Sequence, residues 1–427
     1  MTTLNTQVLA DSPMAPESVD ALDVPRSLLE ELLLKILYFA GPLSVPEWGD
    51  LARLKPLVVE ELFRRLRKEQ LCEVTGMAGS ARLVAITSQG RSRALELLAQ
   101  NQYAGPAPVS LKSYVRQVRS QSVRNAEVHP PAVQRAFSHL VLGKETLVQL
   151  GTALNSGGSI VLYGPSGVGK TAIAEALPRV LAEDRVWIPY AVEVDGQIIT
   201  VHDPLVHRDI QSSPSHYQDM RWVLCHRPTV VVGGELTIEM LDLQFNPVTR
   251  FCSAPAQMKA NNGVLIIDDF GRQRVRPEEL LNRWVVPLDR KIDFLTLAGG
   301  KKIEIPFELF VVFATNMNLA EMVDVAFLRR IQTKIKVDAA SEEQFQEIFS
   351  RVCRDAGVQY DEGLVNELVN WLQTKLKEPL RPCYPRDLVN HICWAALYEE
   401  RKPQLDHNSL LRAVEAYFFA GQPPNKQ

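Results

Sequence analysis

The chain has 427 residues, more than one hydrophobic core usually organises, so we expect two or three domains. Its residues are 46% hydrophobic and 23% charged, as in ordinary globular proteins, and the net charge of −3 argues against nucleic acid as a partner of the whole chain. Six scattered cysteines without a CxxC pair argue against a disulfide framework or a zinc site. The sequence contains no signal-peptide or membrane-span pattern. We therefore expect a cytoplasmic protein.

The N-terminal third predicts three segments. Residues 1–26 contain Pro, Ser and acidic residues without periodicity, which predicts a disordered tail. Residues 27–100 predict helices at 28–39, 46–54 and 56–71, extended segments at 72–76 and 81–87, and a closing helix from Ser88. This order is similar to that of winged-helix domains. Residues 101–129, with Pro, Gly and a basic helix, are predicted to be a linker.

The remainder predicts an α/β core followed by helices. Continuous apolar runs at 159–163, 263–267, 309–314 and 335–337 are typical of parallel strands that are covered on both faces. Residues 130–338 are therefore expected to form a three-layer αβα core. Residues 339–427 predict helices at 341–353, 363–377 and 385–401, which we expect to form a C-terminal helical lid.

A glycine-rich segment follows the first of these strands and opens a helix. It matches G-x-x-x-x-G-K-[ST] and consists of Gly164, Pro165, Ser166, Gly167, Val168, Gly169, Lys170 and Thr171. Its backbone N–H groups are expected to surround phosphate oxygens, which the helix N-terminus also favours. Lys170 is expected to reach the β- and γ-phosphates of ATP, and the Thr171 hydroxyl to join the Mg²⁺ shell. Ser166 lies inside the loop and is not expected to be a nucleophile.

A second apolar strand ends in two carboxylates, Asp268 and Asp269. In a P-loop protein, the first of such residues lies beside the phosphate loop, so Asp268 is expected to hold Mg²⁺. Asp269 is expected to polarise the attacking water as a general base. The alternative is a pair of capping residues at a strand-to-helix turn.

With both motifs present, residues 130–401 resemble an AAA+ ATPase. The resemblance implies that Asn316, after the strand at 309–314, is like the sensor that positions the lytic water. It implies arginine fingers at Arg329 and Arg330, in the segment 326–331, which would act on the nucleotide of a neighbouring subunit. Arg386 is similar to the lid arginine of the family. Each arginine has an alternative as a surface ion pair.

Two predicted hairpins narrow the resemblance. Residues 191–201 alternate around Asp195-Gly196, and residues 291–306 form a second hairpin around Gly299-Gly300. Hairpins at these places look like those of the MoxR-like branch, where such loops usually face the pore of the ring. Two features depart from the family. Asp269 is one methylene shorter than the usual Glu, and no aromatic pore loop is present.

These residues leave two hypotheses. The preferred one is a Mg·ATP-hydrolysing ring, most simply a hexamer, that remodels an unidentified protein client. The alternative is an ATP-gated DNA- or partner-binding switch with little turnover, which the short Asp269 favours. Basic residues outnumber acidic ones in 27–125, so weak DNA binding is expected. The spacing of His202 and His207 is not a metal-ligand pattern.

Overall fold

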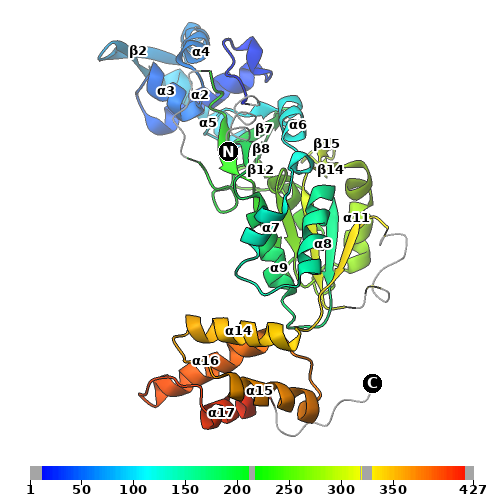
Figure 1. The fold of residues 1–427 in the computed structure, drawn as a ribbon. Coiled ribbons are helices and arrows are strands. Elements are labelled where there is room, and N and C mark those ends of the chain that lie inside the picture. The colour runs from blue at the N-terminus through cyan, green and yellow to red at the C-terminus, as the bar shows by residue number, and fades with distance from the viewer. Residues whose placement is uncertain (1–11, 211–216, 318, 320–328, 419–427) are drawn as a thin grey trace.

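The computed structural model describes residues 12–210, 217–317, 319 and 329–418. Its N-terminal elements, its central sheet and its C-terminal helices follow one another along the length of the molecule (Figure 1). None of the helices in the described ranges is long and apolar enough to cross a membrane.

The central sheet has five parallel strands in the order β10-β13-β16-β5-β17. Their bounds are β5 Ser159–Tyr163, β10 Thr229–Val232, β13 Val264–Ile267, β16 Phe310–Thr315 and β17 Thr333–Lys336. Since all of the strands are parallel, all of their carboxyl ends lie at one edge of the sheet. The apolar runs predict four of these strands, and the edge strand β10 is an addition.

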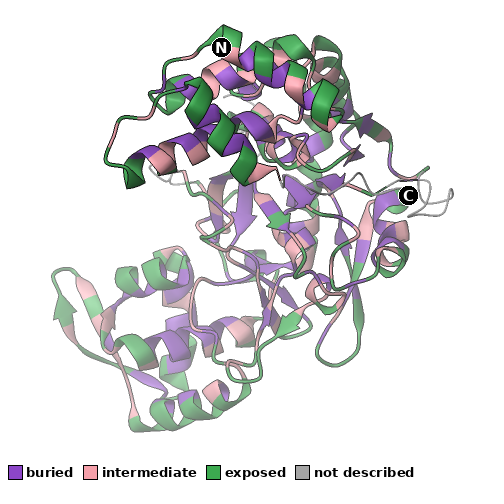
Figure 2. Cartoon of the chain, turned by 90° about the horizontal axis from the view of Figure 1, so that it is seen from below, coloured by how far each residue is buried: buried purple, intermediate pink, exposed green. Residues whose placement is uncertain are grey.

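Alternate residues of each strand enter cores on opposite faces of the sheet. Ile160 and Leu162 pack with α7 (Pro130–Ala136), α8 (Lys144–Ser156) and α9 (Lys170–Ala176), whereas Val161 packs with α11 (Pro277–Arg290) on the other face. Two helical layers therefore cover the mixed α/β core. Figure 2 shows buried residues concentrated on the central strands and on the inner sides of the helices.

The N-terminal unit contains α2 Arg26–Ala40, α3 Val45–Ala52, α4 Pro56–Lys68, a ribbon of β2 Cys72–Ala78 and β3 Ala81–Ile86, and α5 Ser88–Gln100. A short strand, β1 Leu43–Ser44, pairs with β3 and completes a three-stranded sheet. Ser44 and Glu47 form a capping box that begins α3, with Pro46 in its first turn. The observed order follows the predicted one, with β1 added.

The prediction of a disordered tail is wrong for residues 12–26. Val19 and Leu22, of the 3₁₀ turn Asp20–Leu22, are buried in the N-terminal core with side chains of α2 and α4. Arg221 donates to the carbonyl oxygen of Leu22 and also forms a buried ion pair with Asp219 at 2.8 Å. Hydrophobic contacts and this ion pair order a segment that has no periodic apolar pattern.

The predicted linker is also built into the fold. β4 Val109–Ser110 pairs with β7 Ala191–Val194, and α6 Leu111–Ser120 buries Tyr114 and Val118 in the core of a second sheet. That sheet has the order β11-β12-β8-β7-β4, with β8 Gln197–Thr200, β11 Gln244–Phe245 and β12 Cys252–Ser253. A connection with this much buried surface is not a flexible spacer.

Both predicted hairpins are present. β7 pairs with β8, and β14 Ile292–Thr296 pairs with β15 Lys302–Pro306. Their tips contact each other, because Lys301 Nζ lies 2.5 Å from Asp195 Oδ2 and the Ala298 N–H donates to Gln197 Oε1 at 3.2 Å. The two hairpins therefore form one surface feature.

The C-terminal helices have their own core. They are α14 Glu342–Asp355, α15 Glu362–Trp371 with a π-helical end Leu372–Leu376, α16 Cys383–Tyr398 and α17 His407–Tyr417. The last helix, which Asp406 caps, is not among the predicted ones. In Figure 1 this unit lies beside the carboxyl edge of the central sheet.

Candidate functional site

The glycine-rich loop joins β5 to α9 at the carboxyl edge of the sheet. Three of its glycines, Gly164, Gly167 and Gly169, have a positive φ that strains a larger residue, and at the first two an added Cβ would also come too close to another atom. At Gly164, with φ +148°, an added Cβ would lie 2.1 Å from the Val337 carbonyl oxygen, and at Gly167, with φ +81°, it would lie 2.7 Å from Cys383 Sγ. The loop is therefore closely packed against β17 on one side and against α16 on the other.

Lys170 is the first residue of α9, and its side chain turns back over the loop. Its Nζ donates to the carbonyl oxygens of Gly164 at 2.9 Å and Pro165 at 2.7 Å. Burial lowers the pKa of Lys170, and the charges of Asp269 and Asp268 oppose this shift. The ammonium group is thus placed between the glycine-rich loop and two carboxylates.

Asp268 and Thr171 face each other across the edge of the sheet. The Thr171 hydroxyl donates to Asp268 Oδ1 at 3.1 Å, and the Asp269 N–H donates to the same oxygen at 3.0 Å. Adjacent oxygen ligands of Mg²⁺, each about 2.1 Å from the ion, lie about 3 Å apart in an octahedral shell. The hydroxyl and the carboxylate therefore fit two neighbouring positions of a Mg²⁺ site.

The remaining sequence-predicted residues divide into two groups. Asp269, Asn316 and Arg386 line the same cavity as the glycine-rich loop. Asp269 is exposed and has a left-handed backbone, with φ 48°. Arg386 is mostly exposed, and its Nε lies 3.2 Å from Asp387 Oδ1, so its guanidinium is directed to a neighbour on its own helix.

Arg329 and Arg330 do not line this cavity. Arg330 Nε lies 2.9 Å from Asp289 Oδ2 of α11, and Arg329 is exposed. Residues 326–328 of the predicted finger segment lie outside the described residues. The structure therefore brings neither arginine to the cavity of its own chain.

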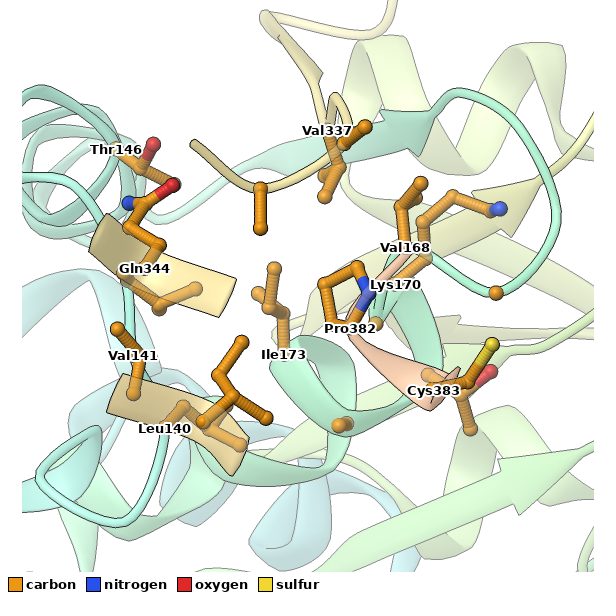
Figure 3. Close-up of a pocket in the computed structure, with 18 of the residues that line it drawn as sticks. Leu140, Val141, Thr146, Val168, Lys170, Ile173, Val337, Gln344, Pro382 and Cys383 are labelled. Atoms are coloured by element: carbon orange, nitrogen blue, oxygen red, sulfur yellow. The ribbon is translucent and has the colours of Figure 1, made fainter. Parts of the chain in front are cut away.

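The cavity has a volume of about 880 Å³ and lies between the sheet edge and the C-terminal helices. Figure 3 shows apolar side chains around it, including Leu140, Val141, Ile173 and Val337, with Gln344 and Thr146 on one side. Sequence reasoning missed the segment 139–143 and the residues of α14 in this wall. No local motif marks them, because only the fold places them opposite the glycine-rich loop.

The C-terminal helices contact the core on both sides of the cavity. Arg351 of α14 donates to the Ser138 carbonyl oxygen at 2.8 Å, and the Cys383 N–H at the start of α16 donates to the Gly167 carbonyl oxygen at 3.3 Å. Burial raises the pKa of the Cys383 thiol, so the thiol stays protonated at neutral pH. A ligand in the cavity would touch both parts of the molecule.

Comparison with known proteins gives loose likenesses. A family profile described as "Domain of unknown function (DUF8689)" matches residues 341–416, within the C-terminal helices. No curated protein matches the chain. Among solved structures, the chain is similar to the RuvB Holliday junction branch migration motor of Thermotoga maritima, with TM-score 0.37 and 14% identity over 64% of this chain and 70% of that one. A mutant of that motor gives TM-score 0.37 and 14% identity over 69% and 72%. At these TM-scores the likeness supports no conclusion about function.

Proposed function

We propose that this chain binds Mg·ATP and hydrolyses it as an AAA+ ATPase, in a ring of subunits that acts on a protein client. The observation that carries the proposal is the pairing of Thr171 with Asp268 at the carboxyl edge of the sheet, beside a glycine-rich loop that opens α9. Ligands of open parallel sheets bind at this edge. The strand order places the loop and the carboxylates there together.

The cavity suits the two ends of a nucleotide differently. The loop N–H groups and Lys170 offer a cationic surface for the triphosphate, with Lys170 Nζ leaving the carbonyl oxygens of Gly164 and Pro165 for phosphate oxygens. The apolar side chains of Leu140, Val141 and Ile173 offer a wall for the base. Bound Mg²⁺, held by Thr171 and Asp268, would supply charge neutralisation of the phosphates.

Hydrolysis requires a residue that accepts a proton from the attacking water. Asp269 lines the cavity and is exposed. It lies close enough to Lys170 for its charge to raise the pKa of the lysine. Asn316 follows β16, the strand between β5 and β13, and can orient the same water. We assign the base to Asp269 and the orienting role to Asn316.

The ring and its client are further parts of the proposal. Arg329 and Arg330 lie away from the chain's own cavity, which favours a role on a neighbouring subunit's nucleotide. The joined tips of the two hairpins, linked by Lys301 and Asp195, offer one feature that nucleotide-driven movement could press against a client. The N-terminal unit, which we interpret as a winged helix, would select that client.

One observation favours the alternative, an ATP-gated switch with little turnover. Asp269 is one methylene shorter than Glu, so its carboxylate reaches less far from the backbone toward a more distant water. Steady-state ATPase assays of the full chain, with and without Mg²⁺ and duplex DNA, test both hypotheses. Mg²⁺-dependent turnover supports the ATPase. Tight Mg·ATP binding with no turnover in any condition supports the switch, and absence of ATP binding contradicts both.

A further inference from the structure

Three side chains from separate segments of the chain, those of His202, Asp209 and Cys225, lie close together. His202 follows β8, Asp209 lies seven residues later, and Cys225 lies in β9 Trp222–His226. One nitrogen, one oxygen and one sulfur atom of these residues lie within 4.8 Å of one another. His202 Nε2 is 2.8 Å from Asp209 Oδ1, and Cys225 Sγ is 3.6 Å from the same oxygen.

The backbone holds these residues in place. Asp209 and Cys225 form an isolated antiparallel bridge, and β9 pairs along its length with β6 Arg185–Pro189. On either side of Asp209, the Ile210 N–H donates to the Leu224 carbonyl oxygen and the Arg208 carbonyl oxygen accepts from His226. Backbone pairing thus fixes Asp209 and Cys225, and His202, two residues after the end of β8, is held by its backbone N–H, which donates to the Tyr190 carbonyl oxygen.

The separations fit a tetrahedral ion with mixed ligands. For bond lengths of about 2.3 Å to sulfur and about 2.0 Å to oxygen, the two ligand atoms lie about 3.5 Å apart. The observed 3.6 Å between Cys225 Sγ and Asp209 Oδ1 matches this value. The 2.8 Å between His202 and Asp209 is a hydrogen bond, and it would need to open by about half an ångström.

The surroundings of the cluster favour a bound cation. His207 stacks on His202 with ring centroids 5.5 Å apart, and its own nitrogens are engaged by the Asp203 N–H and the Lys259 carbonyl oxygen. The Nδ1 atom of His207 accepts the hydrogen bond from the Asp203 N–H, so the ring carries a proton only on Nε2 and has no positive charge. The Lys259 ammonium is paired with Asp203 at 2.8 Å. Neither residue adds an unpaired positive charge beside the cluster.

Within the described residues, solvent reaches the cluster at Asp209. The Cys225 residue is fully buried and the His202 side chain is 8% exposed, whereas the Asp209 side chain is 51% exposed. An ion can therefore enter past Asp209, and the fourth ligand position can be filled by water from that side. Six scattered cysteines did not predict this site, because its ligands come from three segments and only one of them is a cysteine.

We infer that His202, Asp209 and Cys225 form a binding site for Zn²⁺ or a similar borderline transition-metal ion, separate from the proposed Mg²⁺ site. Binding replaces the thiol proton of Cys225, which is released to solvent, and the proton on His202 Nε2 moves to Nδ1 so that Nε2 can bind the ion. Asp209 binds as the carboxylate. Oxidation states do not change.

Metal titration of the chelator-treated full chain tests the inference. We expect one Zn²⁺ per chain, and with Co²⁺ a near-ultraviolet sulfur-to-cobalt charge-transfer band that Zn²⁺ displaces. Cys225→Ser should abolish the band, and Asp209→Asn should weaken Zn²⁺ binding at least about tenfold. Cys252→Ser, another buried cysteine in the same core, and Asp268→Asn, in the proposed Mg²⁺ site, should keep both the band and the affinity.

Three results would overturn the site: no charge-transfer band in the unmodified chain, a band that survives Cys225→Ser, or unchanged Zn²⁺ affinity in Asp209→Asn. Circular dichroism of each variant monitors folding. If Cys225→Ser does not fold, Asp209→Asn decides alone, because its side chain is half-exposed and its loss does not open a cavity in the core.

Discussion

The Thr171 hydroxyl donates a 3.1 Å hydrogen bond to Asp268 Oδ1, although the two residues are 97 positions apart in the chain. The strand order explains the contact. β5 precedes Thr171, β13 precedes Asp268, and both strands lie next to β16. Because the three strands are parallel, the segments that follow them leave the sheet at the same edge. This contact therefore depends on sheet topology, and variants at this edge test the proposed function directly.

Lys170→Ala should lower the affinity for ATP at least tenfold, or about 1.4 kcal/mol. The variant removes an ammonium group that lies over the glycine-rich loop, between the carbonyl oxygens of Gly164 and Pro165. Titration of a fluorescent ATP analogue measures the loss. Lys336→Ala is the matched control, since Lys336 lines the same cavity but its Nζ lies 2.8 Å from Asp338. Equal affinity of Lys170→Ala and the unmodified chain would show that the site is misassigned.

Asp268→Ala and Asp269→Asn should have different effects. Loss of Asp268 removes the proposed Mg²⁺ ligand and the acceptor of the Thr171 hydroxyl, so both Mg²⁺-dependent ATP binding and turnover should fall. Asp269→Asn keeps the shape of the side chain but removes the base, so ATP binding should persist while turnover is lost. The unmodified chain should turn over at about 1 s⁻¹ or below. Unchanged turnover in Asp269→Asn, measured by phosphate release, would exclude Asp269 as the base.

The local part of this site could be predicted from the sequence. The apolar strand, the glycine spacing and the following helix are set by neighbouring residues, and β5 begins and ends where its apolar run does. The same holds for the carboxylates after β13 and for both hairpins, whose turns carry Asp195-Gly196 and Gly299-Gly300. In each case the residues of interest lie within a few positions of the apolar strand or the turn that predicts their structure.

The rest depends on contacts that no local pattern reports. Val19 lies in a segment without a periodic apolar pattern, yet it is buried because a helical unit formed later in the chain offers it an apolar surface. The edge strand β10 is four residues long, and its partner β13 lies more than thirty residues away. Leu140 and Gln344 line the same cavity only because the C-terminal helices lie against the sheet edge. Such pairings are decided by tertiary packing.

Gly167→Ala should destabilise the chain by roughly 1–2 kcal/mol and weaken ATP binding. The left-handed backbone of Gly167 disfavours any side chain, and an added Cβ would lie 2.7 Å from Cys383 Sγ, which would push α16 away from the loop. Urea denaturation and analogue titration measure the two effects. Gly234→Ala is the control, since its Cβ would meet only the Arg272 carbonyl oxygen at 3.8 Å.

The double variant Gly167→Ala/Cys383→Ala separates strain from contact. Removing the sulfur relieves the short approach but leaves the backbone strain, so part of the stability should return. If the double variant is no more stable than Gly167→Ala, the close approach to Cys383 Sγ does not cause the loss of stability, and the backbone strain at Gly167 accounts for it.

The double variant Arg329→Ala/Arg330→Ala should bind ATP normally and fail to hydrolyse it, because neither arginine lines the cavity of its own chain. Mixing it with Asp269→Asn should restore some turnover, since one variant retains intact sites and the other retains intact arginines. Arg330→Ala alone should cost about 0–1 kcal/mol of stability through loss of its partly exposed pair with Asp289. A monomeric chain in ATP, with no rescue at any mixing ratio, would contradict action between subunits.

Duplex DNA should bind the full chain weakly and lose affinity steeply between about 50 and about 200 mM salt. The basic helix α4 and the ribbon carry arginines, but acidic neighbours neutralise them: Arg64 and Arg82 both pair with Glu60, at 3.6 Å and 2.8 Å, and Arg65 lies 3.3 Å from Glu30. Phosphate contacts would have to replace these ion pairs. The N-terminal unit is thus better suited to docking a protein than to reading DNA bases.

Glu60→Gln tests this neutralisation, because one substitution releases both Arg64 and Arg82. Fluorescence anisotropy with a labelled duplex should show tighter binding, and the slope of log affinity against log salt should become steeper by about one to two units. Glu415→Gln, an exposed glutamate on α17, removes the same charge far from α4 and should change neither value. If the unmodified chain binds one DNA sequence specifically at 200 mM salt, the N-terminal unit reads DNA despite these ion pairs, and the ATP-gated DNA switch becomes the better account of the protein.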